Sequence, residues 1–278
     1  MTTPAENEQS ARWNGPSGHA WVDTQAMLTQ VMQPFEPILV DAVKSRSAHD
    51  VLDVGCGFGA TTLAVARTLG SEVRCTGVDI AEPMVTAAQA NADREDLPVR
   101  FLCADAQTHD FEPATFDMIM SRFGVMFFPD PIAAFTNLRR ATRTGGSLTA
   151  IVWRDTQDNP FMTAAERAAA PLLPDLPPRI PNAPGQFGFS DREFVTTVLE
   201  ASGWTDIDIS QLDVTSVMPE PELLGYLSRF GPLGQILPNV EEPLRSRVIE
   251  TARAAFAPFV HGNEVRYNAA CWMVTAHA

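Results

Sequence analysis

A glycine-rich turn is the first feature of this sequence that could do chemistry. Residues 51–54 form an apolar run interrupted only by Asp53, and Gly55, Gly57 and Gly59 follow at alternate positions. Glycines tolerate positive φ and allow a ligand to approach the backbone closely. A helix that starts after the turn offers free N–H groups to an anion. The turn therefore predicts a binding site for a ligand that carries an anionic group.

Acidic residues at the ends of three expected strands extend this site. Asp53, Asp79 and Asp105 each lie at or just beyond the end of an apolar run. In a parallel sheet the carboxyl ends of the strands meet at one edge, where α/β folds bind ligands. We therefore expect the three carboxylates to gather beside the glycine-rich turn.

Two kinds of ligand fit such a turn. Gly55, Gly57 and Ala60 match the G-x-G-x-x-G/A pattern of dinucleotide sites, so a nucleotide-dependent oxidoreductase stays open as an alternative. Asp53 argues against it, because a carboxylate two residues before the first glycine repels a pyrophosphate. The same carboxylate attracts a ligand that carries an ammonium and a sulfonium.

These motifs together resemble those of the class I methyltransferases that use S-adenosylmethionine (AdoMet). The resemblance covers about residues 50–153 and rests on four segments: Leu52-Asp53-Val54-Gly55-Cys56-Gly57-Phe58-Gly59, Gly77-Val78-Asp79-Ile80, Cys103-Ala104-Asp105-Ala106 and Phe116-Asp117-Met118-Ile119-Met120-Ser121. In type the chain is similar to small-molecule methyltransferases, loosely to the ubiquinone/menaquinone C-methyltransferase group. The resemblance implies methyl transfer from AdoMet with S-adenosylhomocysteine as product. A non-enzymatic AdoMet-binding module is a further alternative.

The resemblance implies a cofactor contact for the following residues: Asp53, Gly55, Cys56, Gly57, Asp79, Ile80, Met84, Asp105, Ala106 and Ser121. The glycine-rich turn would hold the methionine carboxylate, and Asp53 would face the amino group directly or through water. Asp79 would accept hydrogen bonds from both ribose hydroxyls, for which a carboxylate has two acceptor atoms. Ile80 and Met84 would flank the adenine, and Asp105 would accept from its amine. The Ala106 N–H would reach the adenine ring, and Ser121 would lie beside the sulfonium.

Two tryptophans near the N-terminus could close over the cofactor. Trp13 and Trp21 precede the first long helical pattern, and an anchor of that helix to the sheet is the alternative. His19 lies between them and is the candidate catalytic base, with a surface or structural role as its alternative. Methyl transfer is an in-line displacement that positioning and desolvation accelerate, so a base is needed only if the acceptor must lose a proton.

Alternating strand and helix patterns position these residues. Strands are expected at 51–54, 73–79, 99–103, 116–121, 147–153, 205–214 and 264–275. This order predicts an α/β fold, Rossmann-like and doubly wound, with a mostly parallel seven-stranded sheet and a helical and loop cover inserted in the C-terminal half. The chain would divide into an N-terminal cap and helix (1–45), an AdoMet-binding core (46–154) and a part (155–278) with the substrate-cover insertions and the last helix and strands of the sheet.

The remaining segments are harder to assign. The first ten residues look disordered, and a helical pattern over 21–44 is expected to break or kink at Pro34 and Pro37. The proline-rich segment 171–184 is expected to be a loop, and a helix should follow at 191–201. Residues 220–259 look helical in two pieces, split by 231–238.

Composition narrows the partners. A formal net charge of −14 argues against nucleic acid and anionic membrane surfaces. No apolar run approaches a membrane span, and the polar, acidic N-terminus lacks the features of a secretory signal. The four cysteines form no CxxC pair, so no metal site is expected, and the reducing cytoplasm fits best.

Apolar and aromatic side chains beyond Trp153 predict a hydrophobic acceptor pocket; they are Phe161, Phe187, Phe189, Tyr226, Phe230, Leu233 and Phe256. The core of an added subdomain is the alternative. The expected acceptor is a small apolar or aromatic metabolite. O- or C-methylation is preferred over N-methylation, because no acidic cage for an amine is evident.

Overall fold

One mostly parallel sheet organises the molecule in this computed structural model, which describes residues 4–174, 176 and 178–278. Its strands are β1 (Asp50–Val54), β2 (Arg74–Asp79), β3 (Arg100–Cys103), β4 (Phe116–Arg122), β5 (Thr142–Trp153), β6 (Thr205–Pro219), β7 (Val260–His261) and β8 (Glu264–His277). They follow the order β3-β2-β1-β4-β5-β8-β6, and the short β7 pairs with β8. The first five strands are parallel, whereas β8 runs antiparallel to β5 and β6. The seven predicted strands are therefore confirmed.

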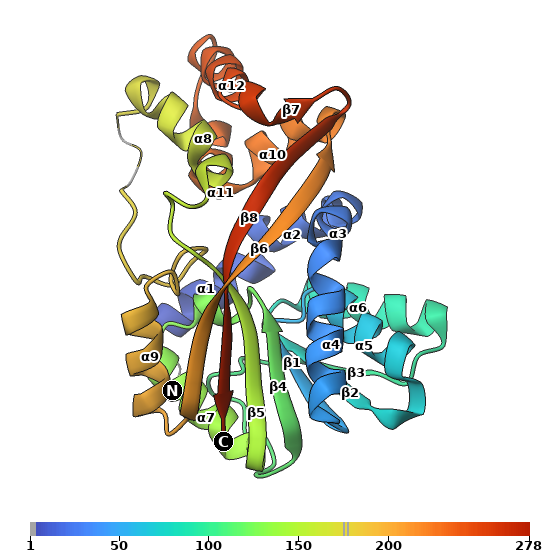
Figure 1. Cartoon of the computed structure of the whole chain (residues 1–278). Helices are drawn as coiled ribbons and strands as arrows, with labels where there is room; N and C mark the ends of the chain where they lie inside the picture. The colour runs from blue at the N-terminus through green and yellow to red at the C-terminus, as the bar shows by residue number, and fades with distance from the viewer. Residues whose placement is uncertain (1–3, 175, 177) are drawn as a thin grey trace.

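Helices cover both faces of this sheet (Figure 1). α4 (Glu36–Arg46) packs beside α5 (Ala60–Leu69) on one side, and α7 (Pro131–Ala141) packs beside α9 (Arg192–Ala201) on the other. α6 (Glu82–Glu95) lies against β2 and β3. Strands covered on both faces need apolar side chains along their length, and residues 51–54 of β1 are all buried. The predicted doubly wound, Rossmann-like architecture is confirmed.

A helical cover sits on the far ends of β6 and β8 (Figure 1). These strands have 15 and 14 residues, so they extend well past the five-residue β1. The extension carries α8 (Pro160–Ala169), α10 (Leu223–Arg229), α11 (Gly231–Ile236) and α12 (Leu244–Ala254). The described residues of the proline-rich segment form an irregular connection after a short 3-10 turn at Ala170–Leu172, as predicted.

The N-terminal region differs from the sequence prediction. The residues expected to be disordered form α1 (Pro4–Asn14) from position 4 onward, and residues 1–3 lie outside the described part. α2 (Pro16–Asp23) and α3 (Gln25–Met32) follow, and a 3-10 turn at Gln33–Phe35 separates α3 from α4. The predicted break at Pro34 is confirmed. The polar sequence of α1 gives no periodic signal, and its long-range contacts decide its conformation.

Two further predictions about the cover were incomplete. α8 was not predicted, although Pro160 stands at its first turn, where proline favours a helix start. The segment 231–238, predicted to split two helical pieces, is itself largely helical because it contains α11. In the part of the chain that the structure describes, no helix has the length and apolarity needed to cross a membrane.

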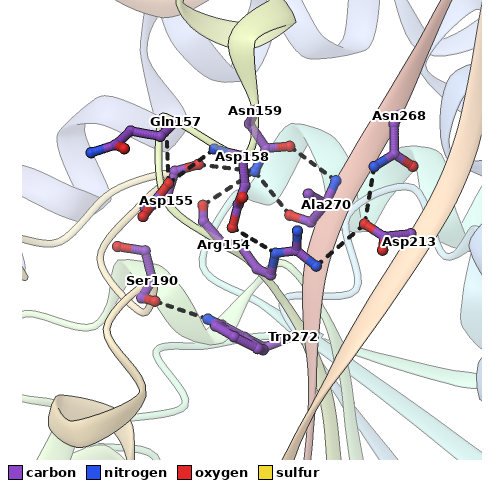
Figure 2. A network of polar contacts seen from close by, with 10 residues as sticks. All are labelled: Arg154, Asp155, Gln157, Asp158, Asn159, Ser190, Asp213, Asn268, Ala270 and Trp272. Carbon is purple, nitrogen blue, oxygen red and sulfur yellow. Dashed lines mark hydrogen bonds and ion pairs between the residues drawn. The ribbon is translucent and has the colours of Figure 1, made fainter.

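A polar network fixes the cover to the sheet where β5 ends (Figure 2). The buried amide of Asn159 donates to Ala270 O (2.9 Å) and accepts from Ala270 N (3.0 Å), so it replaces a strand neighbour for β8. Beside it, Arg154 forms ion pairs with Asp158 (2.8 Å) and Asp213 (3.3 Å). The chain leaves the sheet at this junction, and the side chain of Asn159 still bonds to the backbone N–H and C=O of Ala270 in β8.

Candidate active site

The glycine-rich turn after β1 opens onto a cavity lined by the core and the helical cover. Gly55 has φ 68° and touches Gly124 at the end of β4; an added Cβ would lie 2.5 Å from Gly124 Cα. At Gly57, with φ 53°, an added Cβ would meet only Met84 Sδ, at 3.9 Å. The first position packs two strand ends together, whereas the second leaves the backbone open to a ligand. Both glycines and Cys56 between them line the cavity.

Asp79, at the end of β2, braces this turn from below. One carboxylate oxygen accepts from Gly57 N and the other from Ala81 N, both at 2.9 Å. Burial raises the pKa of Asp79, and the backbone N–H bonds oppose the shift. Each oxygen keeps a second lone pair, so the residue can still accept hydrogen bonds from a ligand in the cavity, which it lines.

Asp53 lies beneath the turn and is 1% exposed. Its carboxylate accepts a 2.6 Å hydrogen bond from the Thr62 hydroxyl of α5. Burial raises its pKa to about 6, although the Thr62 bond and the charge of Arg122 lower it. Asp53 does not itself line the cavity, so its predicted approach to an amino group would run through water.

The residues predicted to surround adenine lie together. Ile80, Met84, Asp105 and Ala106 all line the cavity near the ends of β2 and β3. Asp105 accepts a 2.9 Å hydrogen bond from Gln107 N, which holds its carboxylate at the strand end. The structure thus brings these four residues to one side of the turn, as the sequence predicts.

Ser121 and His19 take other positions. Ser121 is fully buried; its hydroxyl donates to Val54 O (2.7 Å) and accepts from Gly124 N (3.2 Å). It therefore ties β4 to β1 and is not a cavity-lining side chain. The exposed His19 lies outside the cavity lining, with Nδ1 2.9 Å from Gly15 O of its own helical segment.

The N-terminal helices close one side of the cavity. Trp13 and Trp21 both line it, with their ring centroids 5.9 Å apart in an edge-to-face arrangement. Trp13 also meets Phe127 at 5.2 Å, and Trp21 meets Phe230 of the cover at 5.8 Å. The two tryptophans therefore bridge the core and the cover above the turn.

Asn14 fixes these helices to the core, and sequence reasoning missed it. Its Nδ2 donates to Ile80 O (3.0 Å), and its Oδ1 accepts from Glu82 N (2.9 Å). One side chain thereby holds the start of α6 and the residue after Asp79. A single asparagine carries no periodic or motif signal, so only the fold reveals this contact.

The cover supplies the aromatic wall opposite the turn. Five of the seven predicted pocket residues line the cavity: Phe161, Tyr226, Phe230, Leu233 and Phe256. Phe189 instead packs against Phe135, and Phe187 lies under the guanidinium of Arg179. The floor is a parallel stack of Phe123 on Trp153, with centroids 4.3 Å apart. The cavity has a volume of about 300 Å³.

Comparisons with known proteins assign the chain to a protein family. A family model for a methyltransferase domain matches residues 51–146. Nocamycin O-methyltransferase of Saccharothrix syringae is 30% identical over 202 residues, which cover 68% of this chain and 72% of that protein. The chain belongs to the class I AdoMet-dependent methyltransferases. The quinone C-methyltransferase subgroup stays a prediction.

Another curated protein and a solved structure are also similar to this chain. An uncharacterized protein of Mycobacterium tuberculosis is 35% identical over 179 residues, 64% of each chain. The chain thus spans about 64% of the length of the first curated relatives it matches. The structure of the YcgJ protein of Bacillus subtilis is similar in fold to this chain, with a TM-score of 0.56, 17% identity and coverage of 87% of this chain and 97% of that one.

The residues present fit the cofactor of this family. Gly57 leaves an open backbone cradle, and Asp79 keeps free acceptor capacity for hydroxyl groups. The first turn of α5 supplies N–H groups for a carboxylate. Ile80 and Met84 provide apolar surface for a base.

Proposed function

We propose that this protein transfers a methyl group from AdoMet to a small apolar or aromatic metabolite. The proposal rests on one observation: two chemically different sets of residues line a single cavity. The glycine-rich turn and Asp79 form one end, and the aromatic side chains of the cover form the other. A cofactor and an apolar acceptor would therefore meet inside a single cavity.

Three consecutive parts of the chain would have different roles. Residues 1–45 would close over the cofactor, residues 46–154 would bind it, and residues 155–278 would cover the acceptor. Asp79 and the turn would hold the ribose and the methionine part, while Ile80, Met84, Asp105 and Ala106 would hold the adenine. Ser121 would act on the cofactor site indirectly, by holding the end of β4 against β1.

Residues of this chain would position the two reactants and exclude water from them. When bound, AdoMet supplies an electrophilic methyl group on its sulfonium. Trp13 and Trp21 exclude water on one side, and Phe161 and Tyr226 do so on the other. Such positioning and desolvation favour an in-line displacement. O-methylation gains support from the name of the Saccharothrix relative and is preferred to C-methylation, with N-methylation last.

Calorimetric titration with S-adenosylhomocysteine tests the cofactor site. We expect saturable binding of about one molecule per chain. A folded protein that binds NADH instead would support the oxidoreductase alternative. Tight cofactor binding without methyl transfer to any member of a panel of phenols, carboxylic acids, quinones and amines would support a non-enzymatic binding module.

A further inference from the structure

A buried guanidinium, Arg122, lines the cavity at the end of β4. In the sheet order, β1 separates β4 from the strands that carry Asp79 and Asp105. The Arg122 side chain is only 15% exposed. Arg122 therefore stands on the side of the cavity away from the adenine residues.

This cation is poorly satisfied by the protein. A guanidinium has five N–H donors, and among the described residues Arg122 makes one hydrogen bond, from Nη1 to Met32 O (3.1 Å). The Glu36 carboxylate forms a long ion pair with Arg122, 3.9 Å from Nη1 and beyond hydrogen-bond distance. Burial lowers the pKa of Arg122, although the charges of Glu36 and Asp53 raise it. A buried guanidinium with one hydrogen bond and one distant counter-charge keeps donors for an anionic ligand.

The surroundings of Arg122 select a ligand that is both anionic and apolar. The next residue, Phe123, is stacked on Trp153 and also packs on Phe35, with centroids 5.1 Å apart. Phe123 and Trp153 line the cavity and offer apolar surface next to the guanidinium, while the buried Phe35 supports them from behind. An aromatic body with one anionic oxygen matches the two features together.

The cavity lining described here also lacks an evident base for a neutral hydroxyl acceptor. No histidine lines it, and Asp79 and Asp105 stand at the adenine end. Glu166 is ion-paired with Arg179. Burial raises the pKa of Tyr226 to about 12, which favours its neutral form. An acceptor that is already ionised at neutral pH needs no base.

We propose that Arg122 binds an acceptor carboxylate, and that the acceptors are apolar or aromatic carboxylic acids methylated on oxygen. This inference rests on the proposed function and names its substrate class. In the reaction a carboxylate oxygen forms a bond to the methyl carbon as the carbon–sulfur bond breaks. The electron pair of that bond stays on sulfur, and no proton moves. A carboxylate and a sulfonium thus become a neutral methyl ester and a neutral thioether.

Paired ligands that differ only in charge test the proposal. The probes are 2-naphthoate with 2-naphthamide and biphenyl-4-carboxylate with its amide, titrated into protein saturated with S-adenosylhomocysteine and followed by tryptophan fluorescence. We expect each acid to bind the wild type at least about tenfold more tightly than its amide, as a charge-assisted bond predicts. In Arg122→Gln this preference should fall below about threefold, because a charge-assisted bond of that size is removed.

The control is Arg67→Gln, which removes an exposed guanidinium paired with Glu95 and should keep the acid preference. Equal binding of acids and amides by the wild type, no binding of any acid, or an unchanged preference in Arg122→Gln would overturn the proposal. So would a selective loss of S-adenosylhomocysteine affinity in Arg122→Gln, because Arg122 would then serve the cofactor. If Arg122→Gln does not fold, Arg122→Lys takes its place and should retain part of the preference. Failure of the wild type to bind S-adenosylhomocysteine would instead contradict the proposed function.

Discussion

Asp53→Asn should stabilise the cofactor-free protein while weakening cofactor binding. The pKa of Asp53 is about 6 in the folded chain, against 3.8 for an ordinary aspartate. Each pKa unit corresponds to about 1.4 kcal/mol, so the ionised carboxylate costs the folded state about 3 kcal/mol above pH 6. Asparagine carries no charge, and its carbonyl oxygen can still accept from Thr62. The variant should therefore gain about 3 kcal/mol in free energy of unfolding at pH 7.5.

The pH dependence separates this explanation from a general packing effect. Because the folded pKa is raised, the wild type loses stability as pH rises from 3.8 to about 6, and the full cost persists above that range. The advantage of Asp53→Asn should fall to about half at pH 5, that is to about 1.5 kcal/mol. Urea unfolding of both proteins at pH 5.0 and 7.5 measures the difference. A variant that is less stable than the wild type at pH 7.5, or a pH-independent difference, would refute the reasoning.

Three other side chains allow shorter predictions. Asp79→Ala should lower S-adenosylhomocysteine affinity at least about tenfold in calorimetry while the far-ultraviolet dichroism stays native; unchanged affinity would mean that the cofactor lies elsewhere. Asn14→Ala removes the bonds to Ile80 O and Glu82 N, so stopped-flow fluorescence should show faster release of S-adenosylhomocysteine. An unchanged release rate would show that α1 does not close over the cofactor. Asn159→Ala leaves Ala270 N without its side-chain partner, while Ala270 O keeps its bond from Arg154 N. The substitution should cost about 1–3 kcal/mol in urea unfolding, and a loss below about 1 kcal/mol would show that water replaces the amide.

The sequence predicts the sheet and the cofactor edge because both depend on local patterns. β1 is recognisable from a short apolar run, and the glycines after it permit the positive φ angles that the turn needs. Asp79 and Asp105 follow similar runs, so parallel pairing alone brings them to one edge. No long-range contact has to be guessed to place them.

The features that the sequence did not predict depend on contacts between distant segments. α1 has a polar sequence and is held in place by Asn14, whose partners lie more than sixty residues away. Ser121 lies near the end of β4, as expected, yet its hydroxyl bonds to Val54 O rather than facing the cavity. His19 stands near the tryptophans in sequence, but the helix turns its ring toward solvent. Position in a motif thus locates a residue along the sheet and leaves the direction of its side chain open.

Arg122 illustrates the same limit and links the two halves of the site. A lone arginine after a strand has no sequence signature, and its meaning comes from burial beside Phe123 and Met32. Buried charges of both signs lie at the cavity, because burial raises the pKa of Asp53 beneath it and lowers that of Arg122 at its wall. The ion-pair partner of Arg122, Glu36, stays 3.9 Å away, beyond hydrogen-bond distance. Ligands that bring an ammonium to one side and a carboxylate to the other would offset both costs. Cofactor and acid should therefore each stabilise the fold, by an amount that rises with the logarithm of ligand concentration above Kd.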